Sequence, residues 1–219
     1  MKQEIINKIL KEKVVAVVRL NSTTNSAEVI QAIIDGGIKI IEITLTTPGA
    51  LELIEKFSSE SNAVIGAGSI LDKEAAEEVH KRGAKFVVSP ITNNEVIDYC
   101  NKNDLAVMPG AFTPTEVKDA FKKGADIVKV FPADNLGMSF FKNILAPMPD
   151  LKIMPTGGVT IENAADWIEM GACAVGIGSA LVPKNLNGDE LLRKIKENSE
   201  MLVKNVNKNV DQLEVENGK

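Results

Sequence analysis

Short apolar runs alternate along this chain with longer stretches whose apolar residues recur at helical spacing. Such runs are typical of buried parallel strands, and such stretches are typical of helices that cover a sheet. Eight runs are predicted to be strands: Val14–Val18, Ile38–Ile43, Ala63–Ile65, Phe86–Val88, Leu105–Val107, Ile127–Val130, Lys152–Met154 and Ala174–Gly176. The helices predicted between them are Ser26–Asp35, Pro48–Phe57, Asp72–Lys81, Asn94–Lys102, Pro114–Lys122, Met138–Leu145 and Ile161–Met170. This alternation predicts an α/β fold with a parallel sheet.

Glycine follows four of the predicted helices, at Gly36, Gly83, Gly124 and Gly171. Glycine after a helix supplies the left-handed residue that ends it. The successive separations are 47, 41 and 47 residues, which is two strand–helix units each. Eight strands with crossover helices close naturally into a (β/α)8 barrel (a TIM barrel), and an open doubly wound sheet is the alternative.

The chain ends and two helix starts complete the fold prediction. The first residues, MKQEIINKILKEK, are amphipathic and predict an N-terminal helix. The pairs Thr47-Pro48 and Thr113-Pro114 are each typical of a capped helix start. We expect one domain over residues 1–219, with a polar tail from about residue 205 that frays.

Composition and charge exclude several functions. The net charge is −5 without a basic block, so nucleic-acid binding is not expected. The chain has neither an apolar stretch of about 18 residues nor a signal-peptide core, and we expect a cytoplasmic protein without membrane contact. Cys100, Cys173 and His80 are too few and too scattered for a zinc site or a catalytic triad, so neither is expected, and no sequence feature predicts another cofactor.

Lys129 interrupts the apolar run Ile127–Phe131. An unpaired ammonium is poorly solvated inside a sheet, so burial favours the neutral amine and lowers its pKa. A neutral amine on a rigid strand is a nucleophile toward ketones, which is Schiff-base chemistry. The alternative is a lysine at the strand end whose ammonium extends to water.

Glu42 interrupts a second apolar run, Ile40–Ile43. A buried carboxylate has its pKa raised toward the range that suits a general base. Two strands that each carry one charge of opposite sign indicate a shared site. The alternative is a structural ion pair inside the barrel.

The strand ends supply further candidates, because active sites of this fold lie at the carboxyl ends of the strands. Loops after the last two strands often bind phosphate there, and glycine lets backbone N–H groups approach an anion. The candidates are Gly157, Gly158, Gly178 and Ser179, unless these are ordinary turns. Arg19 either binds a carboxylate through its fork or pairs with Glu42. Phe131 is placed to cover a small apolar substrate group.

Several segments in order resemble one family, the bifunctional 2-keto-3-deoxy-6-phosphogluconate (KDPG)/4-hydroxy-2-oxoglutarate (KHG) aldolases. They are Glu42-Ile43-Thr44, Gly66-Ala67-Gly68-Ser69, Ser89-Pro90, Pro109-Gly110, Lys129-Val130-Phe131-Pro132-Ala133, Pro155-Thr156-Gly157-Gly158 and Gly176-Ile177-Gly178-Ser179. The similarity spans about residues 5 to 205. It implies a metal-free class I aldolase on a (β/α)8 barrel, commonly a homotrimer. Its small-molecule substrates and products would include pyruvate and a phosphorylated aldehyde or glyoxylate.

The resemblance also implies roles for single residues. Lys129 would form the Schiff base, and Glu42 would move protons. Contacts to substrate would come from Thr44, Ser69, Pro90, Phe131 and Thr156, with Ser69 standing near the pyruvate carboxylate where the family usually has threonine. Phosphate would bind at Gly157, Gly158, Gly178 and Ser179.

One position departs from the family pattern. Many members carry an arginine four residues after the glutamate to bind the pyruvate carboxylate, and this chain has Thr46 there. We expect Arg19 to take over that contact. Three other functions stay open at this stage: an aldolase for another sugar acid such as the phosphogalactonate, a phosphate-binding isomerase or epimerase, and a non-catalytic barrel.

Overall fold

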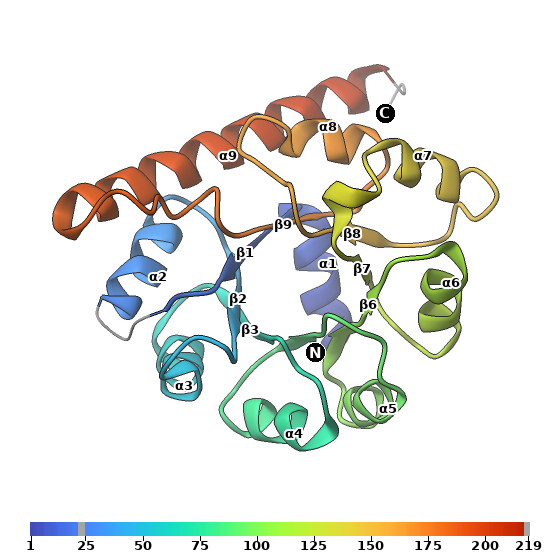
Figure 1. The fold of residues 1–219 in the computed structure, drawn as a ribbon, viewed down its shortest axis with the longest axis horizontal. Helices are drawn as coiled ribbons and strands as arrows, with labels where there is room; N and C mark the ends of the chain where they lie inside the picture. Colours follow the sequence, from blue (N-terminus) through green and yellow to red (C-terminus); the bar gives the residue numbers. More distant parts are fainter. Residues whose placement is uncertain (22–24, 217–219) are drawn as a thin grey trace.

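The computed structural model describes residues 1–21 and 25–216 and shows a closed parallel barrel (Figure 1). One sheet has the order β5-β4-β3-β2-β1-β9 and the other the order β6-β7-β8. The strands are β1 (Val14–Val18), β2 (Ile40–Thr44), β3 (Val64–Gly68), β4 (Phe86–Val88), β5 (Ala106–Met108), β6 (Gly110–Ala111), β7 (Val128–Val130), β8 (Ile153–Pro155) and β9 (Val175–Ile177). All pair in parallel.

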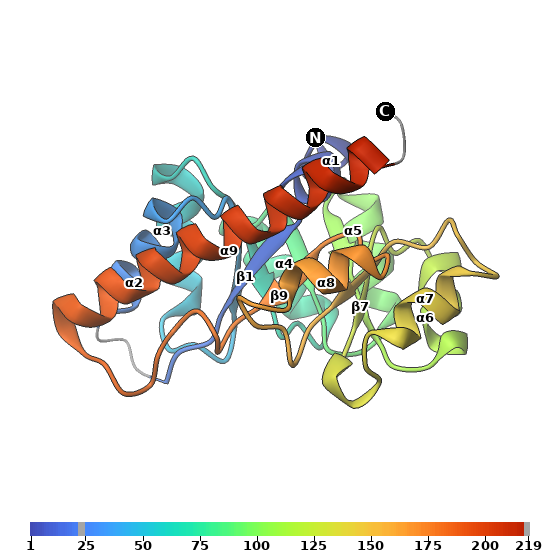
Figure 2. The same cartoon turned by 90° about the horizontal axis from the view of Figure 1, so that it is seen from above.

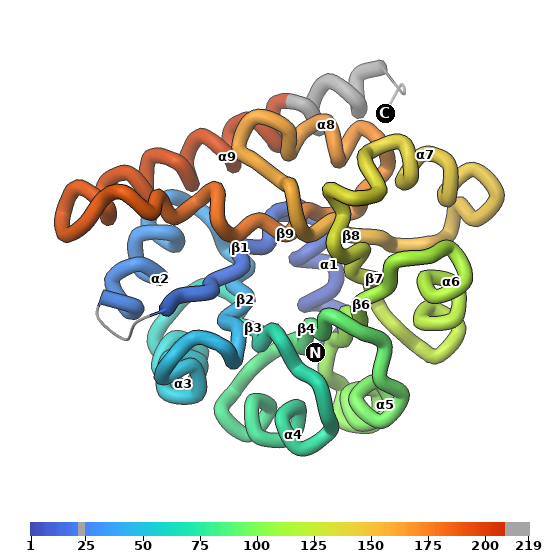
Figure 3. The backbone as a smooth tube through the Cα atoms, in the orientation of Figure 1, coloured from blue at the N-terminus to red at the C-terminus, as the bar shows by residue number. Residues whose placement is uncertain are grey.

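Two short connections join the sheets into a ring (Figure 3). β5 continues into β6 through Pro109, which interrupts the ladder because proline has no N–H to donate. The carbonyl of Pro109 still accepts a hydrogen bond from the Lys129 N–H (2.9 Å). On the other side Thr156, which follows β8, forms a parallel bridge with Gly176 of β9. The predicted (β/α)8 barrel is therefore confirmed, and the open sheet is not.

Helices follow the strands around the outside of the ring. They are α2 (Ser26–Asp35), α3 (Ala50–Glu60), α4 (Lys73–Lys81), α5 (Asn94–Lys102), α6 (Pro114–Lys122), the 3-10 turn η1 (Ala133–Asn135), α7 (Ser139–Leu145), α8 (Ala164–Glu169) and α9 (Gly188–Glu216). Every predicted helix occurs, with ends moved by a few residues. Among the described residues, none of the helices is long and apolar enough to cross a bilayer.

The predicted N-terminal helix, α1 (Lys2–Glu12), lies across the centre of the ring in Figure 1. Its buried Ile6 and Ile9 pack with inward-facing strand residues such as Ile40, Phe86 and Ile127. Lys2 ties the start of α1 to Asp126, just before β7, with Nζ and Oδ2 2.9 Å apart. α1 therefore closes the amino end of the barrel and leaves the carboxyl ends of the strands open.

The tail differs from the prediction. Helix α9 continues to Glu216 and runs along the outside of the barrel past α2 and α8 (Figure 2), so residues 205–216 are helical rather than frayed. Val206 is fully buried, and the Asn205 side-chain amide donates to the carbonyl of Ile161 (3.1 Å). These two contacts hold this part of the helix against the barrel.

The two predicted threonine caps have different outcomes. Thr113 forms a capping box with Glu116 at the start of α6, as expected. Thr47 does not cap α3, which begins at Ala50 after Gly49. Its hydroxyl instead donates to the carbonyl of Val18 (3.2 Å) and accepts the N–H of Leu20 (3.1 Å). Thr47 therefore fixes the loop that leaves β1.

Candidate active site

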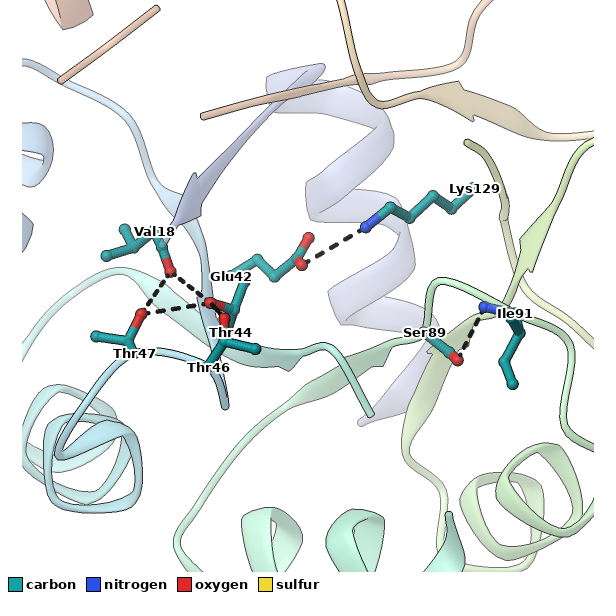
Figure 4. A network of polar contacts seen from close by, with 8 residues as sticks. All are labelled: Val18, Glu42, Thr44, Thr46, Thr47, Ser89, Ile91 and Lys129. Carbon is teal, nitrogen blue, oxygen red and sulfur yellow. Dashed lines mark hydrogen bonds and ion pairs between the residues drawn. The ribbon is translucent and has the colours of Figure 1, made fainter. Parts of the chain in front are cut away.

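Lys129 and Glu42 face each other inside the barrel (Figure 4). Each stands two residues after an isoleucine of the interior, Ile127 and Ile40, and side chains two apart on a strand share a face. Lys129 is 4% exposed and Glu42 is fully buried. Their closest charged atoms, Nζ and Oε1, are 3.8 Å apart. The Lys129 ammonium therefore does not extend to bulk water, and the first of the two interpretations of this residue is favoured.

The carboxylate of Glu42 has no hydrogen-bond partner within the described chain. Both oxygens are buried, and the distance to Lys129 exceeds the 2.7–3.2 Å of a direct hydrogen bond. A buried acceptor without a donor costs free energy. The arrangement is therefore suited to a ligand hydroxyl or a water molecule that donates to Glu42 and completes the site.

Strand glycines make the space that this pair occupies. A Cβ atom on Gly68 would lie 2.7 Å from both Cγ and Cδ of Glu42. A Cβ atom on Gly176 would collide with the hydroxyl of Thr156. The Glu42 carboxylate and the Thr156 hydroxyl therefore fit only because the facing residues, Gly68 and Gly176, have no side chain.

A cavity of ≈ 690 Å³ opens at the carboxyl end of the barrel above Lys129. It is lined by Val17, Arg19, Leu20, Asn21, Lys129, Phe131, Thr156, Gly157, Gly158, Val159, Gly176, Gly178, Ser179, Val182, Pro183 and Lys184. The hydroxyl of Thr156 is buried and lacks a hydrogen-bond partner in the described chain. The Lys129 Nζ lies 5.3 Å from the centre of the Phe131 ring. Eight of the twelve predicted site residues line this one cavity.

The other four predicted residues do not line it. Glu42 lies behind Lys129, within reach of its amine. Thr44 is fully buried, and its hydroxyl donates to the carbonyl of Val18 (3.2 Å), so its observed contacts are structural rather than at the cavity. Ser69 and Pro90 are half-buried in the loops after β3 and β4, and their contact with substrate stays a prediction.

Arg19 lies at the cavity rim and is exposed. The hydroxyls of Thr44 and Thr47 both hold the carbonyl of Val18, the residue before it (Figure 4). The recorded ion pair of Glu42 is with Lys129, so the alternative in which Arg19 pairs with Glu42 is wrong. No ion pair of Arg19 is recorded among residues 1–21 and 25–208, and its exposed guanidinium can therefore face a ligand.

Sequence reasoning missed the cavity residues beyond the matched motifs, above all Lys184. It lies in the loop that follows β9, and this position after a barrel strand is the signal that could have identified it. His80 lies outside this cavity, on α4, where Nδ1 is 3.0 Å from the Tyr99 hydroxyl. In the part of the chain that the structure describes, no three His, Cys, Asp or Glu side chains are grouped to hold a metal ion.

The chain is similar to known aldolases over most of its length. The profile of the family described as KDPG and KHG aldolase matches residues 5–197. The 2-dehydro-3-deoxy-phosphogluconate aldolase of Treponema pallidum is 34% identical over 173 residues, which are 78% of this chain and 82% of that protein. The 2-dehydro-3-deoxy-6-phosphogalactonate aldolase of Escherichia coli is 35% identical over 153 residues, 68% of this chain and 75% of that protein.

A solved structure supports the same relationship. The KDPG aldolase of Legionella pneumophila, with pyruvate captured at low pH as a covalent carbinolamine intermediate, superposes with a TM-score of 0.78 at 26% identity and covers 90% of this chain and 97% of that chain. The barrel and the length over which the two chains superpose agree. The chain therefore belongs to the KDPG and KHG aldolase family.

Proposed function

We propose that this chain is a class I aldolase that cleaves KDPG to pyruvate and glyceraldehyde 3-phosphate, 4-hydroxy-2-oxoglutarate to pyruvate and glyoxylate, or both. The observation that carries the proposal is the strand lysine beneath a cavity, which faces a buried carboxylate that accepts no hydrogen bond within the described chain. Family membership favours this chemistry over an isomerase or a non-catalytic barrel.

The reaction begins at the amine of Lys129. The unprotonated amine adds to the keto carbon, and the carbinolamine loses water to give an iminium ion. Glu42, through a water molecule, accepts the proton of the hydroxyl on C4. The C3–C4 electrons then flow to the iminium nitrogen, the aldehyde leaves, and the remaining enamine takes a proton at C3. Hydrolysis releases pyruvate and restores the amine.

The cavity walls supply recognition for the two ends of the substrate. Arg19 binds the pyruvate carboxylate, as the position of its exposed side chain at the rim supports. The hydroxyl of Thr156 forms a hydrogen bond with a hydroxyl group on the part of the substrate that leaves as the aldehyde, because it is buried and has no hydrogen-bond partner in the described chain. Phe131 covers the pyruvate methyl carbon. Gly157, Gly158, Gly178 and Ser179 receive the phosphate.

The second candidate substrate is 2-keto-3-deoxy-6-phosphogalactonate, since the Escherichia coli relative is named for it. An assay of pyruvate release tests all three acids with wild-type protein and with Lys129→Ala. We expect release from at least one of them and its loss in the variant. Absence of release from every acid, or full activity of Lys129→Ala, would overturn the proposal.

As the family resemblance implies, the proposed assembly is a cytoplasmic homotrimer. Light scattering after size exclusion should then give about three times the chain mass of 23.6 kDa. A mass of one chain at micromolar concentration would contradict it.

A further inference from the structure

The cavity is positively charged in an acidic protein. Within the described residues its charged lining consists of Arg19, Lys129 and Lys184, and no aspartate or glutamate lines it. The whole chain carries a net charge of −5. Walls of one sign in a concave site concentrate ligands of the opposite sign. The cavity is therefore suited to a ligand with more than one anionic group.

Two of the three basic side chains already have a role in the proposed reaction. Lys129 forms the imine, and Arg19 binds the carboxylate beside it. A phosphorylated substrate brings a second anion at its far end. The glycine and serine backbone proposed to receive it carries only partial charges, so a phosphate held there lacks a full positive counter-charge.

Lys184 belongs to the same loop as that backbone. The loop begins with Gly178 and Ser179, and Leu181 anchors it. Leu181 is buried, its N–H donates to the carbonyl of Gly178 (2.9 Å), and its carbonyl accepts the side-chain amide of buried Asn198 (3.3 Å). The chain beyond this anchor lines the cavity up to Lys184.

Lys184 is also free to bind. Its side chain is exposed at the cavity rim. None of the ion pairs recorded within residues 1–21 and 25–208 uses it. A flexible ammonium on a short loop can turn toward a ligand without breaking an existing contact.

We propose that Lys184 contacts the phosphate of the substrate and sets the preference for phosphorylated over unphosphorylated aldehydes. The proposal rests on the aldolase function proposed above. Condensation of pyruvate with glyceraldehyde 3-phosphate and with glyceraldehyde measures that preference as a ratio of kcat/KM, and it needs no knowledge of which sugar acid forms.

The test compares Lys184→Met with Lys184→Arg and with Lys85→Met. Lys85 is an exposed lysine that precedes β4, so it lies at the opposite end of the barrel. We expect Lys184→Met to lower the ratio about 10-fold, the lower end for a charged hydrogen bond. Lys184→Arg keeps the charge and should stay within about threefold of wild type, and Lys85→Met should leave the ratio unchanged.

The outcomes separate the two proposals. Borohydride in the presence of pyruvate should leave a reduced adduct on the wild-type protein, and its absence would overturn the aldolase function. With the adduct present, an unchanged ratio in Lys184→Met, or a wild-type enzyme that does not prefer the phosphorylated aldehyde, would overturn only the role of Lys184. A similar loss in Lys85→Met would also count against it.

Discussion

Alanine at position 68 should push the carboxylate of Glu42 out of the place from which it faces Lys129. The added Cβ atom would lie 2.7 Å from both Cγ and Cδ of Glu42. Nonbonded carbon atoms rest about 3.5–4.0 Å apart, so the carboxylate has to move by about 1 Å. Because a misplacement of that size costs on the order of 100-fold in rate, we expect kcat/KM for pyruvate release to fall about 100-fold.

Gly66→Ala is the matched control for this variant. It lies on the same strand and faces the same interior, but its Cβ atom would lie 2.5 Å from Cγ of Phe86 instead. Overpacking should cost each variant about 1–3 kcal/mol of unfolding free energy. Pyruvate release, measured with lactate dehydrogenase and corrected for the folded fraction from circular dichroism, should drop only in Gly68→Ala.

Two results would refute the steric reasoning. The first is a folded Gly68→Ala protein whose activity stays within about threefold of wild type. The second concerns Glu42→Asp, which withdraws the carboxylate by one carbon atom. Glu42→Asp should lower kcat/KM by a smaller factor in the Gly68→Ala background than in the wild type, because a Cβ atom at position 68 would contact the side chain at position 42. Multiplicative rate effects would mean that the two positions do not interact.

Three further predictions follow from other parts of the molecule. Arg19→Met should raise the KM for pyruvate in condensation about 10-fold or more, since it removes the guanidinium proposed to bind the pyruvate carboxylate, and an unchanged KM would contradict that role. Burial raises the pKa of the Cys100 thiol to about 12, so iodoacetamide at pH 8 should alkylate it at least about 100-fold more slowly in folded than in unfolded protein; equal rates would be inconsistent with that burial. Backbone N–H groups of Thr113 and Phe112 lower the pKa of Glu116, so its carboxylate stabilises the fold above its unfolded pKa, and the benefit disappears as pH falls through the lower folded value. Glu116→Gln should therefore lower the unfolding free energy at pH 7 and progressively less below about pH 4, whereas a pH-independent difference would argue against the cap.

The sequence predicted the barrel because strand burial and helix periodicity are local signals. The runs Val14–Val18 and Phe86–Val88 match β1 and β4 at both ends. Strand β3 was predicted to end at Ile65 and extends to Gly68, because its glycines resemble a turn and in fact make room for Phe86 and Glu42. The separate strand β6 depends on Pro109, and the sequence alone does not say whether a proline ends a strand or only interrupts its ladder.

The candidate site was predictable where it depends on strand register. Lys129 and Glu42 were found because a charge in an apolar run has few explanations, and alternation along each strand then directs both inward. The predicted contact of Thr44 with substrate stays a prediction, and the sequence did not show that its hydroxyl donates to the carbonyl of Val18, a contact between strands that no local pattern encodes. Lys184 was missed because a single lysine in a loop is ordinary until the cavity beside it is known.

The central claim, that the buried amine of Lys129 is the nucleophile, is tested most directly by peptide mapping after reduction with borohydride in the presence of pyruvate. The account predicts one reduced pyruvate on the peptide that contains Lys129 and on no other, in the wild type and, more slowly formed, in Glu42→Gln. An adduct on a different lysine, or none on a protein that releases pyruvate, would contradict it.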